Sequence, residues 1–230
     1  MKNGLITGAS RGIGREVALR VASQGYNLML QGRDVDALAE SCRMVEVNGG
    51  KATPVVADLS DLRGVDTLVN DVTAVPLHLL VNNAGVAHVK PFEEITSQEW
   101  QETLAVNVTA PFVLVKKLFP VMVEGACIVN ILSIAAKTGF ANWSSYSMSK
   151  FALEGMMQSI REELRPRNIR VINIYPSATA TGLWKRVPGE WPEKKMLHPK
   201  EVAEAVAFAI ERPSKVLVEN ISVGDITGTL

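Results

Sequence analysis

The chain alternates between short apolar runs and longer segments in which apolar residues recur every three or four positions. The first pattern is typical of strands buried on both faces, and the second of amphipathic helices. In the first half of the chain, strands are expected at residues 4–7, 28–30, 52–57 and 77–82. Helices are expected between them, at residues 13–23, 34–47 and 61–75.

The second half continues this alternation. Helices are expected at residues 97–123, 144–164 and 199–211, and strands at residues 126–132, 169–175 and within 216–223. Thr96 and Glu99 have the spacing of a capping box, in which each side chain satisfies a backbone donor of the other residue. Pro111 and Pro120 are expected to bend or fray the helix over residues 97–123, because proline lacks a backbone N–H.

The strands of the middle of the chain are apolar on both faces, as in Leu79-Leu80-Val81 and Ile128-Val129-Asn130-Ile131. Such strands are typical of parallel sheets that are covered by helices on both faces. Right-handed crossovers then give an α/β fold with a doubly wound parallel sheet, a Rossmann-type three-layer α/β/α arrangement. No linker, repeat or low-complexity tract interrupts the pattern, so a single domain over residues 1–230 is expected.

Composition narrows the classes of partner. The 24 basic and 24 acidic residues cancel, so no overall field attracts nucleic acid or an anionic membrane. Cys42 and Cys127 lie far apart and form no CxxC pair, which argues against a disulfide framework or a metal site. The N-terminus carries no apolar signal segment, and no window approaches the roughly 20 apolar residues of a membrane span. A cytoplasmic protein without a metal is therefore expected.

A glycine-rich segment follows the first expected strand and opens the first expected helix. Gly8 would permit a tight turn, Gly12 the close approach of a pyrophosphate, and Gly14 a close contact between helix and strand. The N-terminus of the helix would offer free N–H groups and a partial positive charge to the phosphates. The candidate cofactor contacts of this loop are Gly8, Ser10, Arg11, Gly12, Ile13 and Gly14.

The end of the second expected strand distinguishes NAD from NADP. NAD-specific sites place an acidic residue there, to bind the ribose hydroxyls, whereas this strand ends in Gln31-Gly32-Arg33. Arg33 and Arg11 could grip a 2′-phosphate, which predicts NADP(H) as the cofactor. The alternative is that both arginines are solvated surface residues. Asp34 fits better as the N-cap of the next helix than as a ribose ligand.

Tyr146 and Lys150 lie four positions apart in the expected helix over residues 144–164, and so share a face. An ammonium beside a phenol stabilises the phenolate and lowers the tyrosine pKa toward the working pH. Ser133 ends the preceding strand, at the carboxyl edge where open sheets bind ligands. A Tyr-x-x-x-Lys spacing alone is a common coincidence, but together with the glycine loop and Ser133 it indicates acid–base chemistry beside a dinucleotide.

The ordered set of motifs resembles the short-chain dehydrogenase/reductase family over residues 2–225. The loop from Thr7 to Gly14 matches the TGxxxGxG motif of that family. Its serine and its YxxxK motif are matched by Ser133, Tyr146 and Lys150. The remaining matches are Asp58 with Leu59, the NNAG motif at Asn82-Asn83-Ala84-Gly85, Asn107, and the loop from Pro176 to Thr181.

This resemblance implies an oxidoreductase that transfers hydride between NADP(H) and a small-molecule carbonyl or alcohol. Tyr146 would act as the general acid or base, and Ser133 would orient and polarise the carbonyl. Lys150 would lower the tyrosine pKa and bind the nicotinamide ribose, and Asn107 would support a proton-relay water. The implied cofactor contacts beyond the glycine loop are Arg33, Asp58, Leu59, Asn83, Ala84, Gly85, Tyr146, Lys150, Pro176, Thr179 and Thr181.

The sequence departs from the family pattern at a few positions. Ser177 stands where the family has glycine, which a serine can replace if the backbone angles are ordinary. His78 precedes NNAG at a position that is often acidic, and a structural or surface role is expected for it. His88 and His198 have no recognisable partners and receive no role.

The C-terminus is short compared with relatives that end in a strand and a glycine-rich tail at a subunit interface. Here the chain stops at residues 222–230, and whether Ile226-Thr-Gly continues a strand is left open. A homodimer or homotetramer is expected, with the dimer built on the helices at residues 97–123 and 144–164.

A mobile substrate lid is expected at residues 178–198. Its tryptophans and basic residues are Trp184, Trp191, Lys185, Arg186, Lys194 and Lys195. One hypothesis is an anionic or carrier-linked substrate, with the tryptophans closing over an apolar body. The other, which is favoured, is a polar exposed loop that its tryptophans anchor.

Three kinds of reductase remain open: one for 3-oxoacyl groups, one for pteridines, and one for general ketones or aldehydes. A non-catalytic NADP(H)-binding sensor would share the fold, but such proteins usually lose the tyrosine or the lysine. An interaction scaffold has no positive support in the sequence.

Overall fold

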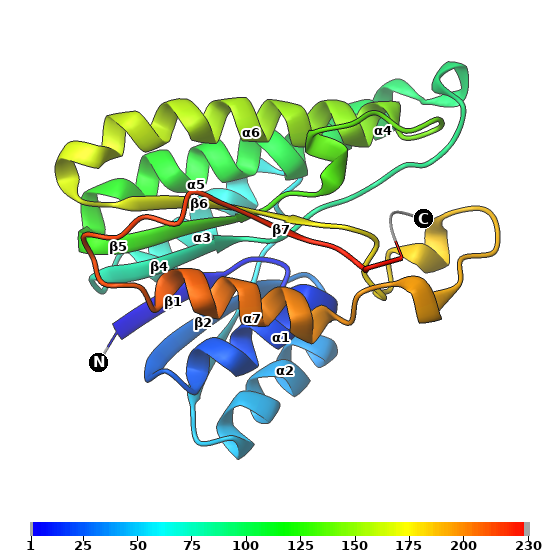
Figure 1. Ribbon diagram of the computed structural model, residues 1–230. Coiled ribbons are helices and arrows are strands. Elements are labelled where there is room, and N and C mark those ends of the chain that lie inside the picture. Colours follow the sequence, from blue (N-terminus) through cyan, green and yellow to red (C-terminus); the bar gives the residue numbers. More distant parts are fainter. Residues whose placement is uncertain (1, 228–230) are drawn as a thin grey trace.

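The strands form one parallel sheet, in the order β3-β2-β1-β4-β5-β6-β7 (Figure 1). The computed structural model describes residues 2–227; Met1 and residues 228–230 lie outside the described part, as does the side chain of Arg186. The strands are β1 (Lys2–Ile6), β2 (Tyr26–Gly32), β3 (Lys51–Val56), β4 (Leu77–Asn82), β5 (Met122–Ile131), β6 (Arg170–Pro176) and β7 (Asn220–Val223). The expected doubly wound parallel sheet is confirmed.

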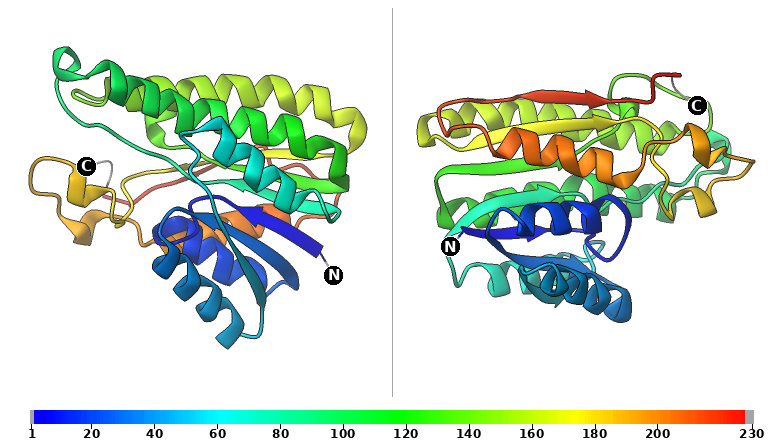
Figure 2. Two further views of the ribbon diagram at one scale, coloured as in Figure 1. Left: turned by 180° about the vertical axis from the view of Figure 1, so that it is seen from behind. Right: turned by 60° about the horizontal axis from the view of Figure 1, so that its bottom comes forward.

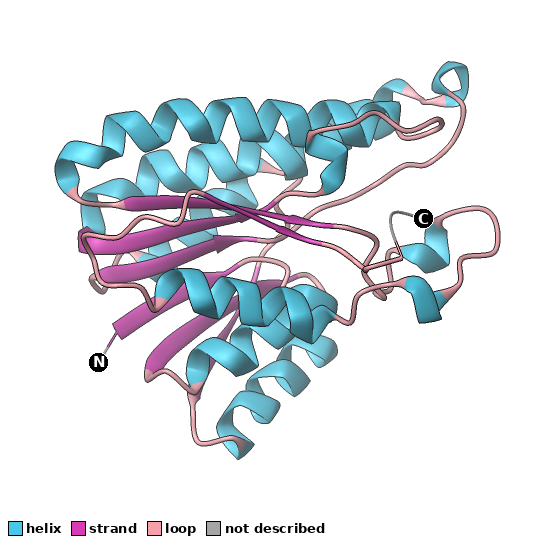
Figure 3. Ribbon diagram, viewed as in Figure 1, coloured by secondary structure: helices cyan, strands magenta, loops and turns pink. Residues whose placement is uncertain are grey.

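Helices cover both faces of this sheet, as the views in Figures 2 and 3 show. One face carries α1 (Gly12–Ala22), α2 (Val35–Val47) and α7 (Pro199–Ile210). The other carries α3 (Leu62–Val72), α5 (Ala110–Leu118) and α6 (Ser144–Leu164), with α4 (Ser97–Leu104) beside α6. The helices therefore complete the three layers that the alternating pattern predicts.

The central strands are buried on both faces, which explains their continuous apolar runs. Leu79 and Leu80 are both fully buried, and they belong to the two opposite cores. Ile128 and Val129 divide in the same way between the two faces. Removing this much apolar surface from water is the main source of stability in such a sheet.

The strand order reverses at β1, which pairs with β2 on one side and with β4 on the other. In open α/β sheets, ligands bind in the crevice beyond the carboxyl ends of the strands at such a switch point. The loops after β1, β4, β5 and β6 therefore meet at one edge of the sheet. In Figure 1, the segment between β6 and α7 stands beyond that same edge.

The helix expected at residues 97–123 is divided. Its first part, α4, opens with the expected capping box between Thr96 and Glu99. A π-helical turn (Ala105–Thr109) then precedes Pro111 in α5, and a 3₁₀ turn (Phe119–Val121) contains Pro120. The expected distortion at both prolines is thus confirmed, because each missing N–H coincides with a change of helical hydrogen bonding.

The strand β5 begins at Met122, earlier than the expected start at residue 126. Glu124 and Gly125 interrupt the apolar run, and so they hide the first part of the strand in the sequence. Gly125 has a φ of 79°, and the pairing of β4 with β5 is irregular there. Glycine at a bulge of this kind is common because it tolerates a left-handed backbone.

The helical run Ser97–Val121 is long and apolar enough, by length and composition alone, to cross a membrane. The expectation that no segment approaches this criterion was therefore wrong. Within the run, Leu114, Val115 and Leu118 are buried in the core against the sheet. The criterion is weak evidence for a span, because helices that pack on a core meet it too.

Candidate active site

A cleft of about 1420 Å³ opens at the carboxyl edge of the sheet. This volume exceeds the roughly 300–1,000 Å³ of an ordinary small-molecule site, so the cleft has room for a dinucleotide and a second molecule. Gly14 and Asn107 do not line it. The other predicted site residues all do: Gly8, Ser10, Arg11, Gly12, Ile13, Arg33, Asp58, Leu59, Asn83, Ala84, Gly85, Ser133, Tyr146, Lys150, Pro176, Thr179 and Thr181.

The glycines of the loop after β1 occupy positions that only glycine accommodates easily. Gly8 and Gly12 have φ values of 63° and 58°, in the left-handed region that disfavours other residues. A Cβ atom on Gly14 would lie 2.4 Å from the Gly8 carbonyl oxygen and 2.5 Å from Asn83 Nδ2. Gly14 thus acts through close packing behind the loop, as its spacing predicts, and not as a lining residue.

The NNAG motif after β4 fixes the glycine loop. Asn83 Nδ2 donates to the carbonyl oxygens of Thr7 and Gly8, at 2.9 and 3.1 Å. In return, Thr7 Oγ1 accepts hydrogen bonds from the backbone N–H groups of Asn83 and Ala84, both at 3.0 Å. These contacts hold the loops after β1 and β4 together at the point where the strand order reverses.

Gln31 is a residue of this loop system that sequence reasoning missed. Its side chain is buried at the end of β2, where Oε1 accepts from the Gly8 N–H at 2.9 Å and Nε2 donates to the Ala57 carbonyl at 2.7 Å. Gln31 therefore links the glycine loop to the segment after β3. Its sequence signal is a polar residue at the end of an apolar run, just before Gly32-Arg33.

Arg11 and Arg33 both lie on the wall of the cleft, and both have acidic neighbours. Arg11 Nη2 lies 2.6 Å from Asp34 Oδ2, and Arg33 Nη1 lies 3.8 Å from Asp58 Oδ1. Asp34 also accepts from the Ala37 N–H, so its expected role as the N-cap of α2 is confirmed. About half or more of each arginine side chain is exposed, and ion pairs in such positions contribute only about 0–1 kcal/mol.

Tyr146, Lys150 and Ser133 meet on one wall of the cleft. Lys150 Nζ is buried, donates to the Ile131 carbonyl at 2.8 Å, and lies 5.6 Å from the centre of the Tyr146 ring. A hydrogen bond with the Ser133 hydroxyl favours the ionised form of Tyr146. The helix α6 thus presents the phenol and the amine beside the hydroxyl that follows β5.

Burial opposes the electrostatic effect that the spacing predicts. It raises the pKa of Tyr146 to about 12, with only a partial offset from Ser133, and lowers the pKa of Lys150 to about 8. The expected lowering of the tyrosine pKa by Lys150 is therefore not observed in the protein alone. The physical reason is that the charged form of each group loses hydration, while the amine is turned toward the Ile131 carbonyl.

Asn107 lies in the π-helical turn and is buried behind the cleft. Its Nδ2 donates to the Val86 carbonyl and to Ser149 Oγ, both at 2.9 Å, and its Oδ1 accepts from the Val86 N–H at 2.9 Å. The side chain thus fixes the segment after NNAG against α6. Because both amide hydrogens are used, a water could meet this side chain only at Oδ1, and the relay role stays a prediction.

A ladder of asparagines crosses the sheet beneath the cleft, and it too was missed. Asn82 of β4 donates to Asn130 of β5 at 2.9 Å, and Asn130 donates to Asn173 of β6 at 3.0 Å. The three residues are direct neighbours in the strand register, and Asn173 pairs in turn with Asn220 of β7. Each is a polar residue inside an apolar run, which is the signal that the sequence offered.

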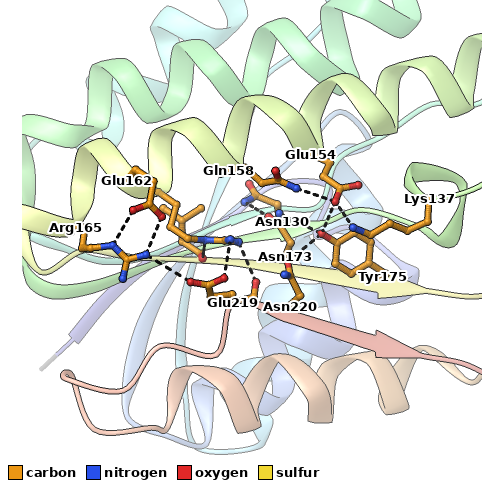
Figure 4. A network of polar contacts seen from close by, with 12 residues as sticks. Asn130, Lys137, Glu154, Gln158, Glu162, Arg165, Asn173, Tyr175, Glu219 and Asn220 are labelled. Carbon is orange, nitrogen blue, oxygen red and sulfur yellow. Dashed lines mark hydrogen bonds and ion pairs between the residues drawn. The ribbon is translucent and has the colours of Figure 1, made fainter.

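The ladder continues into a cluster around Glu154 of α6 (Figure 4). The Tyr175 hydroxyl contacts Glu154 Oε1 at 3.2 Å and Asn220 Oδ1 at 3.0 Å, and Lys137 forms an ion pair with Glu154. Gln158 donates to the same carboxylate at 3.0 Å. The hydrogen bond between Lys137 and Glu154 raises the pKa of Lys137. The cluster ties the segment after Ser133, the helix of Tyr146 and the end of β6 into one unit.

We expect Glu154→Leu to lower the free energy of unfolding by about 1–3 kcal/mol, because it leaves the buried Tyr175 hydroxyl and its neighbours without their carboxylate acceptor. Urea unfolding of the purified protein measures this. Glu162→Leu is the matched control, since Glu162 lies on the same helix but is mostly exposed beside Arg165 (Figure 4). Equal effects of the two substitutions would show that the cluster contributes no special stability.

Aromatic rings line the part of the cleft next to Tyr146, which is called the substrate half below. Trp143 lies edge-on to Tyr146, with ring centroids 5.5 Å apart, and edge-on to Trp184 at 5.8 Å. Trp191 lies 4.8 Å from Trp184. The lid tryptophans therefore converge on Trp143, which sequence reasoning did not single out although it stands three positions before Tyr146.

His88, which received no role from the sequence, also lines the cleft. Its Nε2 lies 3.0 Å from Glu102 Oε2, and its Nδ1 lies 3.6 Å from Glu99 Oε1. Lys90 pairs with Glu99 at 2.7 Å, and the hydrogen bond from this lysine is the main reason that the pKa of Glu99 falls to about 2. All four residues line the cleft, with Lys90 paired to Glu99 and His88 in contact with both carboxylates.

The remaining departures from the family pattern have structural explanations. Ser177 has an ordinary backbone conformation and donates its N–H to the Val223 carbonyl at 2.8 Å, so serine is accommodated there. His78 accepts from the Asn3 N–H, as a structural role predicts. His198 caps α7 by accepting from the Lys200 N–H. The described C-terminal residues after β7 form a turn at Ile226, and the rest of the tail lies outside the described residues.

Comparison with known proteins agrees with this geometry. A family model described as short chain dehydrogenase matches residues 2–190. The sepiapterin reductase of Chlorobaculum tepidum is 31% identical, over 98% of this chain and 97% of its own. The angucycline C-6 ketoreductase LanV, solved with bound NADP, has a TM-score of 0.88 and 31% identity, over 99% of this chain and 96% of its own.

A short chain dehydrogenase from Burkholderia cenocepacia, solved in complex with NADP, superimposes with a TM-score of 0.90 at 28% identity, over 97% of this chain and 96% of its own. Sequence and fold thus agree across these proteins. The chain belongs to the short-chain dehydrogenase family of oxidoreductases.

Proposed function

We propose that this protein binds NADP(H) and interconverts a carbonyl and an alcohol, with Tyr146 as the residue that exchanges the proton. The observation that carries the proposal is the convergence of Tyr146, Lys150 and Ser133 on one wall of a cleft that the glycine loop also lines. The NADP bound in solved relatives supports the choice of cofactor.

The residues of the cleft fit a dinucleotide with a 2′-phosphate. The N-terminus of α1 has no side-chain cap and no acidic residue in its first turn, so its N–H groups are available to a pyrophosphate. Gly12 lines the cleft in a left-handed conformation and brings the backbone close to that position. Arg11 and Arg33 lie where a 2′-phosphate would replace their weak contacts with Asp34 and Asp58.

When bound, NADPH would supply the hydride that reduces the carbonyl carbon. Tyr146 donates its phenolic proton to the carbonyl oxygen, and the phenol is then reprotonated from solvent, so that carbonyl, NADPH and one proton give alcohol and NADP⁺. Ser133 donates a hydrogen bond to the same oxygen and fixes its position next to Tyr146. Lys150 would contact the ribose and, with the cofactor bound, would favour the ionised tyrosine, while Asn107 would hold the surrounding loop and a relay water.

Residues 178–198 act as the lid of the substrate half. The two ends of this segment are held together, since the Ala180 N–H donates to the Leu197 carbonyl and the Leu197 N–H donates to the Ala178 carbonyl. Closure of such a segment excludes water from the reacting atoms. The exposed aromatic residues Trp100 and Phe112 on the 97–121 run, and Phe151 on α6, support a homodimer or homotetramer built on these helices.

The test is the oxidation of NADPH, and separately of NADH, in the presence of a panel of aldehydes, ketones, 3-oxoacyl thioesters and pteridines. Turnover of at least one carbonyl with NADPH is expected. Tight binding of NADPH without turnover of any compound would instead favour a sensor that keeps the fold and lacks the reaction.

We expect Arg33→Ala to weaken the binding of NADPH by about 10- to 100-fold and to leave NADH almost unchanged, because a charge-assisted hydrogen bond to the 2′-phosphate contributes about 1.5–3 kcal/mol. Fluorescence titration of each cofactor measures both dissociation constants. Arg43→Ala, at an exposed arginine of α2 that pairs with Glu40, is the control. If NADPH and NADH weaken equally in Arg33→Ala, the assignment of this arginine to the phosphate is wrong.

A further inference from the structure

The aromatic rings in the substrate half of the cleft form a continuous series that begins at the proposed proton donor. Tyr146, Trp143, Trp184 and Trp191 follow one another, with centroid separations of 5.5, 5.8 and 4.8 Å. All four side chains are partly buried and line the cleft. Rings in such arrangements leave faces and edges on which a further flat ring can stack or lie edge-on.

The polar atoms of the two lid tryptophans are already used by the backbone. Trp184 Nε1 donates to the Thr179 carbonyl at 2.8 Å, and Trp191 Nε1 donates to the Pro188 carbonyl at 3.1 Å. These indoles therefore offer apolar ring surface, and not donors, to a ligand. Phe140, Val86 and Val89 add further apolar surface to the lining of the cleft.

The charged residues of this half do not select an ionic ligand. Lys90 is paired with Glu99, and His88 contacts both Glu99 and Glu102. Glu94 and Lys185 also line the cleft, but both are exposed and have opposite signs. Of the basic residues named in the hypothesis of an anionic substrate, Lys185 lines the cleft, whereas Lys194 and Lys195 do not. The surroundings are thus suited to a neutral molecule.

We propose that the substrate is a neutral, planar aromatic ketone or aldehyde, whose ring system packs against Trp143 and Trp184 while its carbonyl oxygen meets Tyr146 and Ser133. The proposal rests on the proposed function for its chemical step: the carbonyl carbon gains hydride from NADPH, the oxygen gains the Tyr146 proton, and the aromatic ring is left intact. The lid tryptophans then bind substrate as well as anchoring their own loop.

A matched pair of ketones tests this class. 1-Tetralone and 1-decalone share a fused ten-carbon skeleton, but only the first has an aromatic ring coplanar with its carbonyl. Because conjugation makes 1-tetralone the less reactive ketone, a lower KM for it would report binding and not intrinsic reactivity. We expect a KM for 1-tetralone about tenfold below that for 1-decalone, which is the order of one or two aromatic contacts.

Binding is measured independently of turnover by calorimetric titration into the protein saturated with NADP⁺. 1-Naphthol is expected to bind about tenfold more tightly than decahydro-1-naphthol. It is also expected to bind more tightly than 1-naphthoate, because the site is built for a neutral ring. Tighter binding of 1-naphthoate would overturn the neutral class.

Substitutions of Trp184 test whether this residue causes the preference for 1-naphthol over decahydro-1-naphthol. Trp184→Leu is expected to remove most of the tenfold difference between the two alcohols, and Trp184→Phe to keep part of it. Phe208→Leu is the control, since Phe208 is an exposed aromatic residue of α7 that does not line the cleft. Unchanged NADPH binding in each variant shows that the fold is retained.

The outcomes separate the two proposals. If 1-decalone is reduced with the lower KM and both alcohols bind equally, the aromatic class is wrong while the reductase stands. If neither ketone is reduced but 1-naphthol keeps its advantage and loses it in Trp184→Leu, the ring preference stands and the reductase function fails. If the advantage persists in Trp184→Leu, the aromatic series is not its cause and the proposal falls.

Discussion

Replacing Tyr146 with phenylalanine is expected to lower kcat/KM for carbonyl reduction by about 10²- to 10⁴-fold, the usual contribution of a positioned acid. Only the phenolic hydroxyl is lost in this variant. In the parent protein, its pKa of about 12 keeps this hydroxyl protonated at neutral pH, so that it can donate its proton. The ring, and therefore its edge-on contact with Trp143, is retained. Initial rates of NADPH oxidation with the best carbonyl of the panel measure the effect.

Tyr26→Phe is the matched control for this substitution. Tyr26 is a buried tyrosine of β2, and it does not line the cleft. Loss of its hydroxyl should leave turnover unchanged. NADPH affinity should largely persist in Tyr146→Phe, since only one of the predicted cofactor contacts is lost and the glycine loop and the arginines are untouched. A Tyr146→Phe variant with full turnover would remove Tyr146 from the proposed chemistry.

Replacing Lys150 with methionine is expected to raise the free energy of unfolding at pH 7 by up to about 3 kcal/mol while abolishing reductase activity. Lys150 is almost fully buried, and burial lowers its pKa from 10.5 to about 8, where one pKa unit corresponds to about 1.36 kcal/mol. The protein therefore carries an unfavourable buried ammonium at neutral pH. Such a cost at a reacting group is typical of sites that trade stability for activity.

The pH dependence follows from the sign of this shift. Between pH 8 and 10.5 the unfolded chain binds the Lys150 proton and the folded chain does not, so the lysine makes stability rise with pH in that window. Buried Cys127 and Tyr146 have raised pKa values and act in the opposite direction above about pH 9.

The difference between parent and Lys150→Met isolates the lysine contribution. This difference should be largest at pH 7 and should shrink as the pH approaches 10.5. Urea unfolding at several pH values measures it, with Lys200→Met, at an exposed lysine of α7, as the control. A difference that does not change with pH would show that the buried amine does not titrate in this range.

The asparagine ladder shows where sequence reasoning stopped. Asn82, Asn130 and Asn173 each stand inside an apolar run, so their positions as isolated polar residues were visible. Their mutual hydrogen bonds depend on the register of β4, β5 and β6, which places the three residues side by side. Register between strands distant in the sequence is set by packing across the whole sheet, and no local pattern encodes it.

The contacts in the substrate half of the cleft were even harder to predict from the sequence. Trp184 and Trp191 were visible in the lid, but the series that they form with Trp143 depends on how a long irregular segment folds back toward the start of α6. Loops carry few periodic signals, and their conformation is decided by what they pack against. The pairing of His88 with Glu102 was hidden for the same reason.

The sequence by itself determined the succession of strands and helices along the chain, the parallel sheet and the glycine loop, because hydrophobic periodicity and glycine spacing are local properties of the chain. The ordered set of motifs identified the family by resemblance. It also identified Tyr146, Lys150 and Ser133 as a group. Only the tertiary structure decided the direction of the Tyr146 and Lys150 pKa shifts, the ladder beneath them and the aromatic wall beside them. These properties depend on burial and on distances between remote segments, which exist only once the chain has folded.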